Sequence, residues 1–346
     1  MAYNLVREML DYPKLELFVY LLNEGTLADK LGRLPVDLTV AAERNSTFLQ
    51  LLSTTRGLIN RHQPHIIHSH RYKENILAYL ASRGRRPIRL VTTQHGMPDT
   101  GSHQSFKKGR LVAEFNRLLL RTRFDKVVGV SANISDYLKA DCGIPAERIS
   151  VVNNGINLPK TCTSQVDGSS LVVGSAGRLF PVKNFPLMVE IAQVVFTDEP
   201  AVRFELIGEG PERSKIEQKI AQHRLEGVFT LPGHRDDINE FYSSINVYLN
   251  TSEHEGIPMS ILEAMAYGLP VIAPNVGGIG EIITDGVDGF LVNDRRPESF
   301  AQPLLQLRDA TVRRRIGEAA REKIRGSFSA QSMGAHYCQI YRDLLA

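Results

Sequence analysis

Short apolar runs alternate with amphipathic segments along this chain, and the alternation restricts the possible folds more than any other feature. The runs at residues 15–21, 66–68, 90–94, 126–130 and 149–152 predict strands, and the clearest helices lie at 48–60 and 75–82. Because helices rather than tight turns fall between the strands, the strands are expected to be parallel. The sequence predicts an α/β fold with doubly wound sheets.

The same alternation starts again after a polar stretch at residues 160–170 that is typical of a linker. A chain of 346 residues is also too long for one ordinary domain. We therefore expect two Rossmann-like domains, residues 1–165 and 166–328. The second has predicted strands at 171–176, 203–207, 228–231, 247–250, 270–273 and 289–292, helices at 186–196, 211–223, 239–242 and 259–267, and a continuously helical tail from 298.

Charge is divided unevenly between the two predicted domains. Residues 1–165 hold 23 Lys and Arg against 14 Asp and Glu, whereas the remainder holds 18 against 24, which favours different partners for the two parts. No apolar run approaches about 18 residues and no basic-then-apolar leader is visible, so the cytoplasm is the expected location. The three cysteines lack CxxC spacing and predict neither a disulfide framework nor a metal site.

The segment SEHEGIPMSILEAMAYG carries Glu255 and Glu263 eight positions apart. Gly256 and Pro258 indicate a turn into a helix that starts near Met259, whose first backbone amides form an anion site. The two carboxylates suit hydroxyl groups of a sugar and of a ribose. From spacing alone, an exposed capping acid and a surface helix acid are the simpler interpretation, which only the neighbouring motifs change.

Two neighbouring motifs suit a phosphate ligand. Gly277 and Gly278 follow a predicted strand, where glycines let a backbone approach a phosphate without a Cβ clash. In GSAGRLFPVK, Arg178 and Lys183 lie at a strand's carboxyl end, and their two cations suit a diphosphate. A plain turn and solvated cations explain each motif taken alone. A nicotinamide-dependent oxidoreductase is disfavoured because GxGxxG is missing.

Together these motifs resemble a known family. GRLFPVKN, LIGEGPERSKIE, the E-x7-E segment, AMAYGLPVIA, GGIGEII and DGVDGFLV occur in the order found in the C-terminal domain of family 4 retaining glycosyltransferases of the GT-B fold. The first half is similar more loosely, through PHIIHSH, TTQHG, VVGVSANISDYL and VVNNGIN. The resemblance implies two domains facing across a cleft, with the acceptor held by the first, the donor by the second, and a closing helix at 329–346 packing back on the first.

The resemblance also implies residue roles. Arg178 and Lys183 would hold the donor diphosphate, Glu255 the transferred sugar and Glu263 the ribose, while His95 in TTQHG matches a family histidine near the donor sugar. Backbone around residues 231–235 would recognise the base. The further donor-binding residues implied are Gly177, Gly233, Gly256, Ile257, Gly277, Gly278 and Glu281. The family needs no metal ion, and this chain has no DxD motif of the metal-binding kind.

Two features of the first half bear on other partners. His65, His68 and His70 in HIIHSH offer no evident third ligand for zinc, so they are expected to be strand-end residues, with His70 a candidate for acceptor contact. Residues 107–126 interleave basic and apolar side chains, which fits either a helix on an anionic lipid surface or a core helix with a solvated basic face. No nucleic-acid recognition motif is present, so no such partner is expected.

The chain departs from the family at its start. It begins inside the first family helix, so the N-terminal sheet is expected to lack its first strand. The sequence predicts a retaining, metal-independent transferase that moves sugar from a nucleotide diphosphate sugar, with uridine favoured, to a glycan or lipid-linked acceptor in polysaccharide, lipopolysaccharide or glycolipid synthesis. It would act in the cytoplasm or peripherally at the inner face of the membrane. The alternative is a catalytically silent sugar-nucleotide-binding protein.

Overall fold

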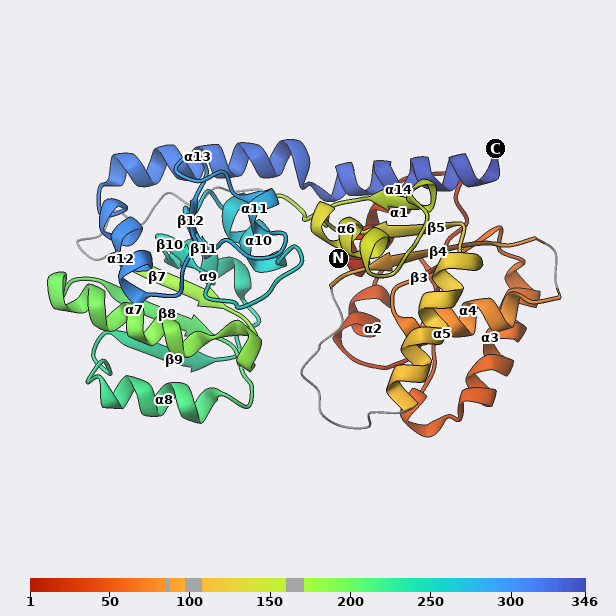
Figure 1. The fold of residues 1–346 in the computed structure, drawn as a ribbon, viewed down its shortest axis with the longest axis horizontal. Helices are drawn as coiled ribbons and strands as arrows, with labels where there is room; N and C mark the ends of the chain where they lie inside the picture. Colours follow the sequence, from red (N-terminus) through yellow and green to blue (C-terminus); the bar gives the residue numbers. More distant parts are fainter. Residues whose placement is uncertain (85–86, 97–107, 160–170) are drawn as a thin grey trace. The chain divides into compact units, whose positions relative to one another are not determined.

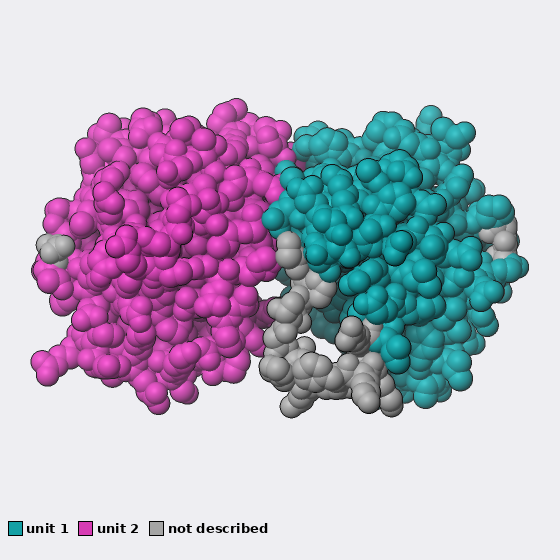
Figure 2. Space-filling model, viewed as in Figure 1, with its two compact units in different colours: residues 1–155, 330–346 teal, residues 156–329 magenta. Residues whose placement is uncertain are grey.

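The chain forms two compact units, which Figure 2 colours separately. The computed structural model describes residues 1–84, 87–96, 108–159 and 171–346. Unit 1 comprises Met1–Gly155 with Ala330–Ala346, and unit 2 comprises Ile156–Ser329. The predicted linker at 160–170 and the domain boundary predicted at 165 lie outside the described residues. Each unit is an α/β structure with parallel sheets, as predicted (Figure 1).

Unit 2 contains a six-stranded sheet in the order β12-β11-β10-β7-β8-β9, and every neighbouring pair is parallel. The chain winds outward from β7 to β9, then returns to the other side of β7 and winds outward through β10, β11 and β12. The order therefore reverses between β7 and β10, which is the arrangement of a doubly wound sheet. The strands are β7 (Val172–Ala176), β8 (Arg203–Ile207), β9 (Phe229–Gly233), β10 (Val247–Leu249), β11 (Val271–Pro274) and β12 (Phe290–Val292).

Helices cover both faces of this sheet, because strand residues alternate in direction. In β10, Val247 and Leu249 point into one buried cluster, while Tyr248 between them points into the other. Each such fully buried side chain stabilises the fold by about 1.5–3 kcal/mol. The first cluster contains α7 (Phe185–Asp198), α8 (Arg213–Gln222) and α12 (Pro297–Gln306), and the second contains α9 (Ile238–Ser244), α10 (Met259–Ala266) and α11 (Ile279–Ile282).

The tail after residue 297 is helical but not continuous as predicted. It forms α12, then α13 (Ala310–Ser327), then α14 (Ala330–Leu345). The first break has a local cause: the carboxylate of Asp309 accepts hydrogen bonds from the backbone N–H groups of Thr311 and Val312, which caps a new helix. No described helix combines the length and apolarity that crossing a bilayer requires.

Unit 1 holds two separate parallel sheets. One pairs β1 (Phe18–Leu21) with β2 (Asp37–Val40), a short and half-exposed strand that the sequence analysis did not predict. The other has the order β3-β4-β5-β6. Its strands are β3 (Ile66–Ser69), β4 (Arg89–Gln94), β5 (Lys126–Gly129) and β6 (Ile149–Val151). The absence of a further strand that the family pattern would place in this domain stays a prediction.

The helices of unit 1 pack around these sheets. The C-terminal helix α14 belongs to this unit and lies against α1, where its buried Tyr337 shares a cluster with Val91 and Val128 of the sheet. The remaining elements are α1 (Ala2–Met9), α2 (Thr26–Leu31), α3 (Phe48–His62), α4 (Tyr72–Ser82), α5 (Lys108–Thr122) and α6 (Ala132–Ala140), with short 3-10 turns at Glu43–Asn45 and Ala146–Arg148.

Candidate functional site

The candidate site lies in unit 2 where the strand order reverses. Ligands of doubly wound sheets bind at the carboxyl ends of the strands, at this reversal. Here the loop after β7 leads through the 3-10 turn Pro181–Lys183 into α7, and the loop after β10 leads into α10. The predicted residues Arg178 and Lys183 lie in the first loop, and Glu255 and Gly256 lie in the second. The topology alone thus places four predicted residues at one sheet edge.

The two loops meet through an ion pair. The Lys183 Nζ lies 2.5 Å from Oε1 of Glu255, and the same oxygen accepts a hydrogen bond of 2.7 Å from the Ser252 hydroxyl. Both charged side chains are half-buried, so solvent screens the pair less than it would at the surface. Backbone contacts join the same loops: the N–H of Glu253 donates to the Val182 carbonyl at 2.8 Å. The side chains of Lys183 and Glu255 are therefore held together.

Glu263 lies on α10, and a buried tyrosine from α9 holds it. The Tyr242 hydroxyl donates to Oε2 of Glu263 at 2.9 Å, and its ring stacks on Tyr267 with centroids 5.3 Å apart. Burial, with the charge of Glu263 adding, raises the pKa of Tyr242 well above its usual value. The hydroxyl therefore stays protonated and remains a donor to the carboxylate at any physiological pH.

The paired glycines have a structural role that the sequence analysis did not anticipate. A Cβ on Gly277 would lie 1.8 Å from the Glu255 carbonyl oxygen, and a Cβ on Gly278 would lie 2.3 Å from that of Gly256. The Gly278 N–H also donates to the Gly256 carbonyl at 3.0 Å. Only glycine allows this backbone contact, so Gly277 and Gly278 support the loop that carries Glu255.

Two other predicted residues lie nearby, Ile257 in the loop before α10 and Glu281 on α11. The side chain of Ile257 is buried in the core, so only its backbone is available to a ligand. Glu281 lies half-buried on the short helix α11.

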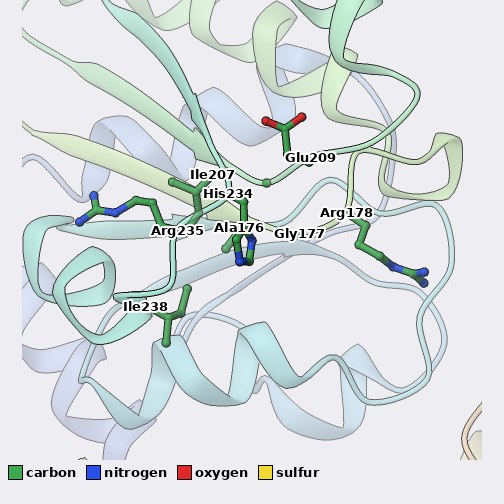
Figure 3. A pocket seen from close by; sticks show the side chains of 9 residues that line it. Ala176, Gly177, Arg178, Ile207, Glu209, His234, Arg235 and Ile238 are labelled. Carbon is green, nitrogen blue, oxygen red and sulfur yellow. The ribbon is translucent and has the colours of Figure 1, made fainter. Parts of the chain in front are cut away.

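A hollow of about 350 Å³ lies beside these loops, at the carboxyl ends of β7, β8 and β9 (Figure 3). Arg178 is exposed, and its guanidinium lies 5.1 Å from the centre of the Phe180 ring. In Figure 3 this guanidinium extends away from His234 and Ile238. Gly233 is buried next to the hollow and accepts a hydrogen bond of 2.8 Å from the Gly208 N–H. The lining residues are Ala176, Gly177, Arg178, Ile207, Gly208, Glu209, His234, Arg235 and Ile238.

Several of these lining residues were not singled out from the sequence. Ile207 and Glu209 come from LIGEGPERSKIE, and His234 and Arg235 come from the segment expected to recognise the base through backbone. The signal that finds them is position, since each lies at the end of a parallel strand of the same sheet or within two residues after it. Arg235 is fixed by carboxylates, with Glu205 at 3.2 Å and Asp237 at 2.6 Å. The carboxylates therefore hold the Arg235 side chain in place where it lines the hollow.

Three histidines gather at the carboxyl ends of β3 and β4 in unit 1. His70 Nδ1 lies 3.1 Å from His95 Nε2, and His70 stacks on His68 with centroids 4.5 Å apart. His68 Nδ1 in turn lies 2.6 Å from the Tyr341 hydroxyl. Among the described residues, no group of three or more His, Cys, Asp and Glu side chains is arranged to hold a metal ion. His70 and His95, which the sequence indicated separately, are thus in direct contact within unit 1.

The imidazoles of this group are neutral at physiological pH. Burial, with His95 adding, lowers the pKa of His68 to about 3. His95 is exposed to solvent, yet desolvation by the groups around its ring, the N-terminal amine and Arg71 lower its pKa to about 4. Burial and the neighbouring histidines also lower the pKa of His70. Neutral imidazoles both donate and accept hydrogen bonds, so this edge of the sheet suits hydroxyl groups.

Comparisons with known proteins agree with this geometry. The family model described as glycosyl transferases group 1 matches residues 163–323, and that described as glycosyltransferase family 4 matches residues 2–160. The N-acetyl-alpha-D-glucosaminyl L-malate synthase of Bacillus anthracis is 29% identical over 314 residues, covering 86% of this chain and 79% of that protein.

Two further similarities cover most of the chain. An Escherichia coli UDP-Gal:alpha-D-GlcNAc-diphosphoundecaprenol alpha-1,3-galactosyltransferase is 24% identical over 302 residues, covering 83% of this chain and 78% of that protein. Among solved structures, Anabaena Alr3699/HepE in complex with UDP is similar with a TM-score of 0.84 and 21% identity, covering 99% of this chain and 96% of that one. At that identity the structural similarity shows the fold alone.

Proposed function

Because the chain belongs to the family 4 glycosyltransferases of the GT-B fold, we propose that unit 2 binds a nucleotide diphosphate sugar and that the enzyme transfers the sugar with retention of configuration. The observation that carries the proposal is the Lys183–Glu255 pair at the strand-order reversal of unit 2. It places a cation for a diphosphate and a carboxylate for sugar hydroxyls side by side. A uridine nucleotide is the proposed donor base, and the similar Anabaena structure contains UDP.

The pair suggests how the donor enters. The charges of Lys183 and Glu255 satisfy each other in this structure. A donor diphosphate would compete for the Lys183 ammonium, and sugar hydroxyls would donate to the Glu255 carboxylate. In this exchange Lys183 gains an anionic partner and Glu255 gains hydrogen-bond donors, so neither charged group is left desolvated without a partner. Arg178, exposed beside the hollow, is proposed to bind the diphosphate as well.

The chemical step needs no protein nucleophile in this proposal. The bond between the anomeric carbon and the diphosphate oxygen breaks, and the acceptor oxygen bonds to the same carbon on the same face. The acceptor proton passes to the departing phosphate oxygen. Lys183 and Arg178 stabilise the negative charge that grows on the diphosphate. These cations support metal-independent turnover, so activity is expected to persist in EDTA.

Other residues are proposed to position the donor. Glu263, held by Tyr242, would accept from ribose hydroxyls. The nucleotide would lie in the hollow beside Gly177 and Gly233, with the amides around Gly256 and Ile257 near its phosphates. Glu281 is proposed to lie near the donor, on the resemblance of its motif to the family pattern alone. His95 and His70 of unit 1, both neutral, are proposed to contact sugar and acceptor hydroxyls.

The proposal is tested by donor turnover. UDP, GDP and ADP sugars are incubated with the enzyme, nucleotide release is measured, and the anomeric configuration of the product is read by NMR coupling constants. UDP at a hundred times its dissociation constant should stabilise the protein against unfolding by about 2.7 kcal/mol. Lys183→Ala should abolish this stabilisation. Lys215→Ala is the control, because Lys215 is an exposed lysine that pairs with Glu212 at the start of α8. An inverted product, or equal effects of the two variants, would refute the proposal.

The acceptor is proposed to be a glycan or a lipid-linked sugar in polysaccharide, lipopolysaccharide or glycolipid synthesis. The Escherichia coli relative is named for an acceptor carried on diphosphoundecaprenol. In this chain, α5 exposes Leu111, Val112, Phe115 and Leu118, with Arg121 and Arg123 exposed near its end. An apolar stripe with a cationic flank suits the interface of an anionic membrane. Lys107, the start of the predicted segment, lies outside the described residues.

We therefore propose peripheral binding at the cytoplasmic face of a membrane through α5. Sedimentation with anionic vesicles is expected, and it should weaken as salt is raised and vanish with zwitterionic vesicles. Leu111→Asp should abolish it. Leu49→Asp is the matched control, because Leu49 on α3 is as exposed as Leu111, at 73% against 71%. Equal loss in both variants, or no sedimentation of the wild type at low salt, would refute this part.

A further inference from the structure

Arg295 makes a contact at the candidate site that no sequence motif indicates. It follows β12, and its guanidinium donates to three successive backbone carbonyls of the loop after β10. The distances are 3.4 Å to Thr251, 2.9 Å to Ser252 and 3.2 Å to Glu253. These carbonyls belong to the segment that connects β10 to Glu255. One side chain thus holds three consecutive residues of the loop.

The same segment is fastened on its other side to the loop that carries Lys183. The Thr251 hydroxyl donates to the Lys183 carbonyl at 2.9 Å, and the Glu253 N–H donates to the Val182 carbonyl at 2.8 Å. Residues 251–253 therefore lie between Arg295 and the Lys183 loop, with bonds to both. Any shift of this segment would move Glu255 relative to Lys183.

The guanidinium suits this task for a geometric reason. It is planar and presents five N–H donors in a fixed fork, so it can hold several carbonyls in one arrangement. A lysine ammonium has three donors on a flexible stem and fixes directions less well. Arg295 is exposed to solvent, so its bonds contribute little to global stability. Its effect is expected on the local placement of the loop.

We propose that Arg295 is a positioning residue for glycosyl transfer: it holds residues 251–253 so that Glu255 and Lys183 keep the relative placement that the donor requires. The inference rests on the proposed function, because it assumes that this pair binds the donor. Arg295 itself is not placed against the reacting atoms. It acts through the loop, and the effect should appear in turnover more than in folding.

The chain provides a matched control in the next residue. Arg296 is also exposed, but its guanidinium bonds to the Asp294 carboxylate, at 3.0 Å from Nη2 and 3.2 Å from Nε. Arg295→Ala is expected to lower kcat/KM about 10- to 100-fold, because small misplacements of reacting groups cost this much. Arg295→Lys should recover part of the loss. Arg296→Ala should retain wild-type kinetics, and the unfolding temperatures of all three variants should stay within about 4 °C of wild type.

Two measurements separate positioning from a loss of structure. Ser252→Ala removes the hydrogen bond that the Ser252 hydroxyl donates to the Glu255 carboxylate. If Arg295 acts through the same loop, the effects of Arg295→Ala and Ser252→Ala on kcat/KM should not multiply in the double variant. Hydrogen exchange of the amides of residues 251–256 should accelerate in Arg295→Ala and not in Arg296→Ala.

Equal kinetics in Arg295→Ala and Arg296→Ala, multiplying effects in the double variant, or unchanged exchange would each overturn the inference. If the wild type transfers no sugar, the proposed function fails instead. The exchange experiment needs no activity and still decides whether Arg295 holds the loop.

Discussion

The carboxyl edges of the six-stranded sheet of unit 2 and the four-stranded sheet of unit 1 are built alike and carry different chemistry. In unit 2, the edge at β7 and β10 presents a lysine paired with a glutamate. In unit 1, the edge at β3 and β4 presents imidazoles whose pKa values are lowered, so that they are uncharged at neutral pH. Parallel topology brings strand-end residues together in both units. The residue types that follow each strand then decide whether the edge suits a charged ligand or hydroxyl groups.

The largest effect is expected from removing the cation at the charged edge. Lys183→Ala should lower kcat about 10² to 10³-fold, because Lys183 is proposed to stabilise charge that grows on the leaving diphosphate. His95→Ala at the neutral edge should cost less, about tenfold, because a neutral hydrogen bond changes little between ground and transition state. Steady-state rates at saturating donor measure both. If His95→Ala costs as much as Lys183→Ala, the contrast between the two edges is wrong.

The next effect concerns the glycines at the two edges. Gly277→Ala should destabilise unit 2 by about 2–3 kcal/mol, since its Cβ would lie 1.8 Å from a backbone oxygen of Glu255 and its φ is 53°. At the neutral edge, a Cβ on Gly96 would meet nothing within 4 Å, so Gly96→Ala should be nearly neutral. Denaturant unfolding measures these differences in the free energy of unfolding.

Gly286 provides the control for backbone strain without a steric clash. Its φ is 72°, and a Cβ there would have open space around it. Gly286→Ala should cost only about 1 kcal/mol, the strain without the clash. Were Gly277→Ala no worse than Gly286→Ala, the contact between the Gly277 and Glu255 loops would contribute nothing to stability.

Much of this architecture could be predicted from local patterns, and the exceptions have physical causes. The strand predicted at 203–207 coincides with β8, because its apolar residues Phe204, Leu206 and Ile207 are the ones buried in the core. The strand β2 was missed because its four residues, DLTV, are half-exposed and carry little apolar signal. At the site, motifs indicated Lys183 and Glu255 separately. Their contact spans 72 residues and follows only from the sheet order.

Arg295 lay beyond prediction for another reason. It binds backbone carbonyls, which every residue possesses, so no complementary side chain elsewhere in the sequence indicates its role. The hollow beside β7, β8 and β9 is similar, since strand-end position rather than residue type defines most of its wall. Roles that depend on backbone partners or on sheet order therefore need coordinates.

A smaller effect follows from the neutral histidines. The pKa of His68 is lowered to about 3 in the folded chain, against about 6.5 unfolded. Between these values the unfolded chain binds a proton that the folded chain does not. Stability present above pH 6.5 should therefore be lost as pH falls, by up to about 1.4 kcal/mol per pH unit for this group.

Urea unfolding between pH 7.5 and 4.5 measures this slope. His68→Gln should reduce the dependence of the free energy of unfolding on pH. Part of the dependence should remain, because the pKa of His70 is also lowered. Carboxylates contribute mainly at lower pH, because their usual pKa values lie near 4. A slope in His68→Gln equal to that of the wild type would show that His68 is not neutral for the reason given.

The smallest effect compares one tyrosine hydroxyl at each edge. Tyr242 donates to Glu263 at 2.9 Å in unit 2, and the Tyr341 hydroxyl lies 2.6 Å from His68 Nδ1 in unit 1. Tyr242→Phe should raise the donor KM about fivefold with kcat unchanged, because one hydrogen bond is worth about 1 kcal/mol and a hold on the ribose acts equally in ground and transition states. Tyr341→Phe should leave the donor KM unchanged and lower only the free energy of unfolding, by about 1 kcal/mol. If Tyr341→Phe alters donor binding or Tyr242→Phe does not, the proposal that the charged edge of unit 2 binds the nucleotide is wrong.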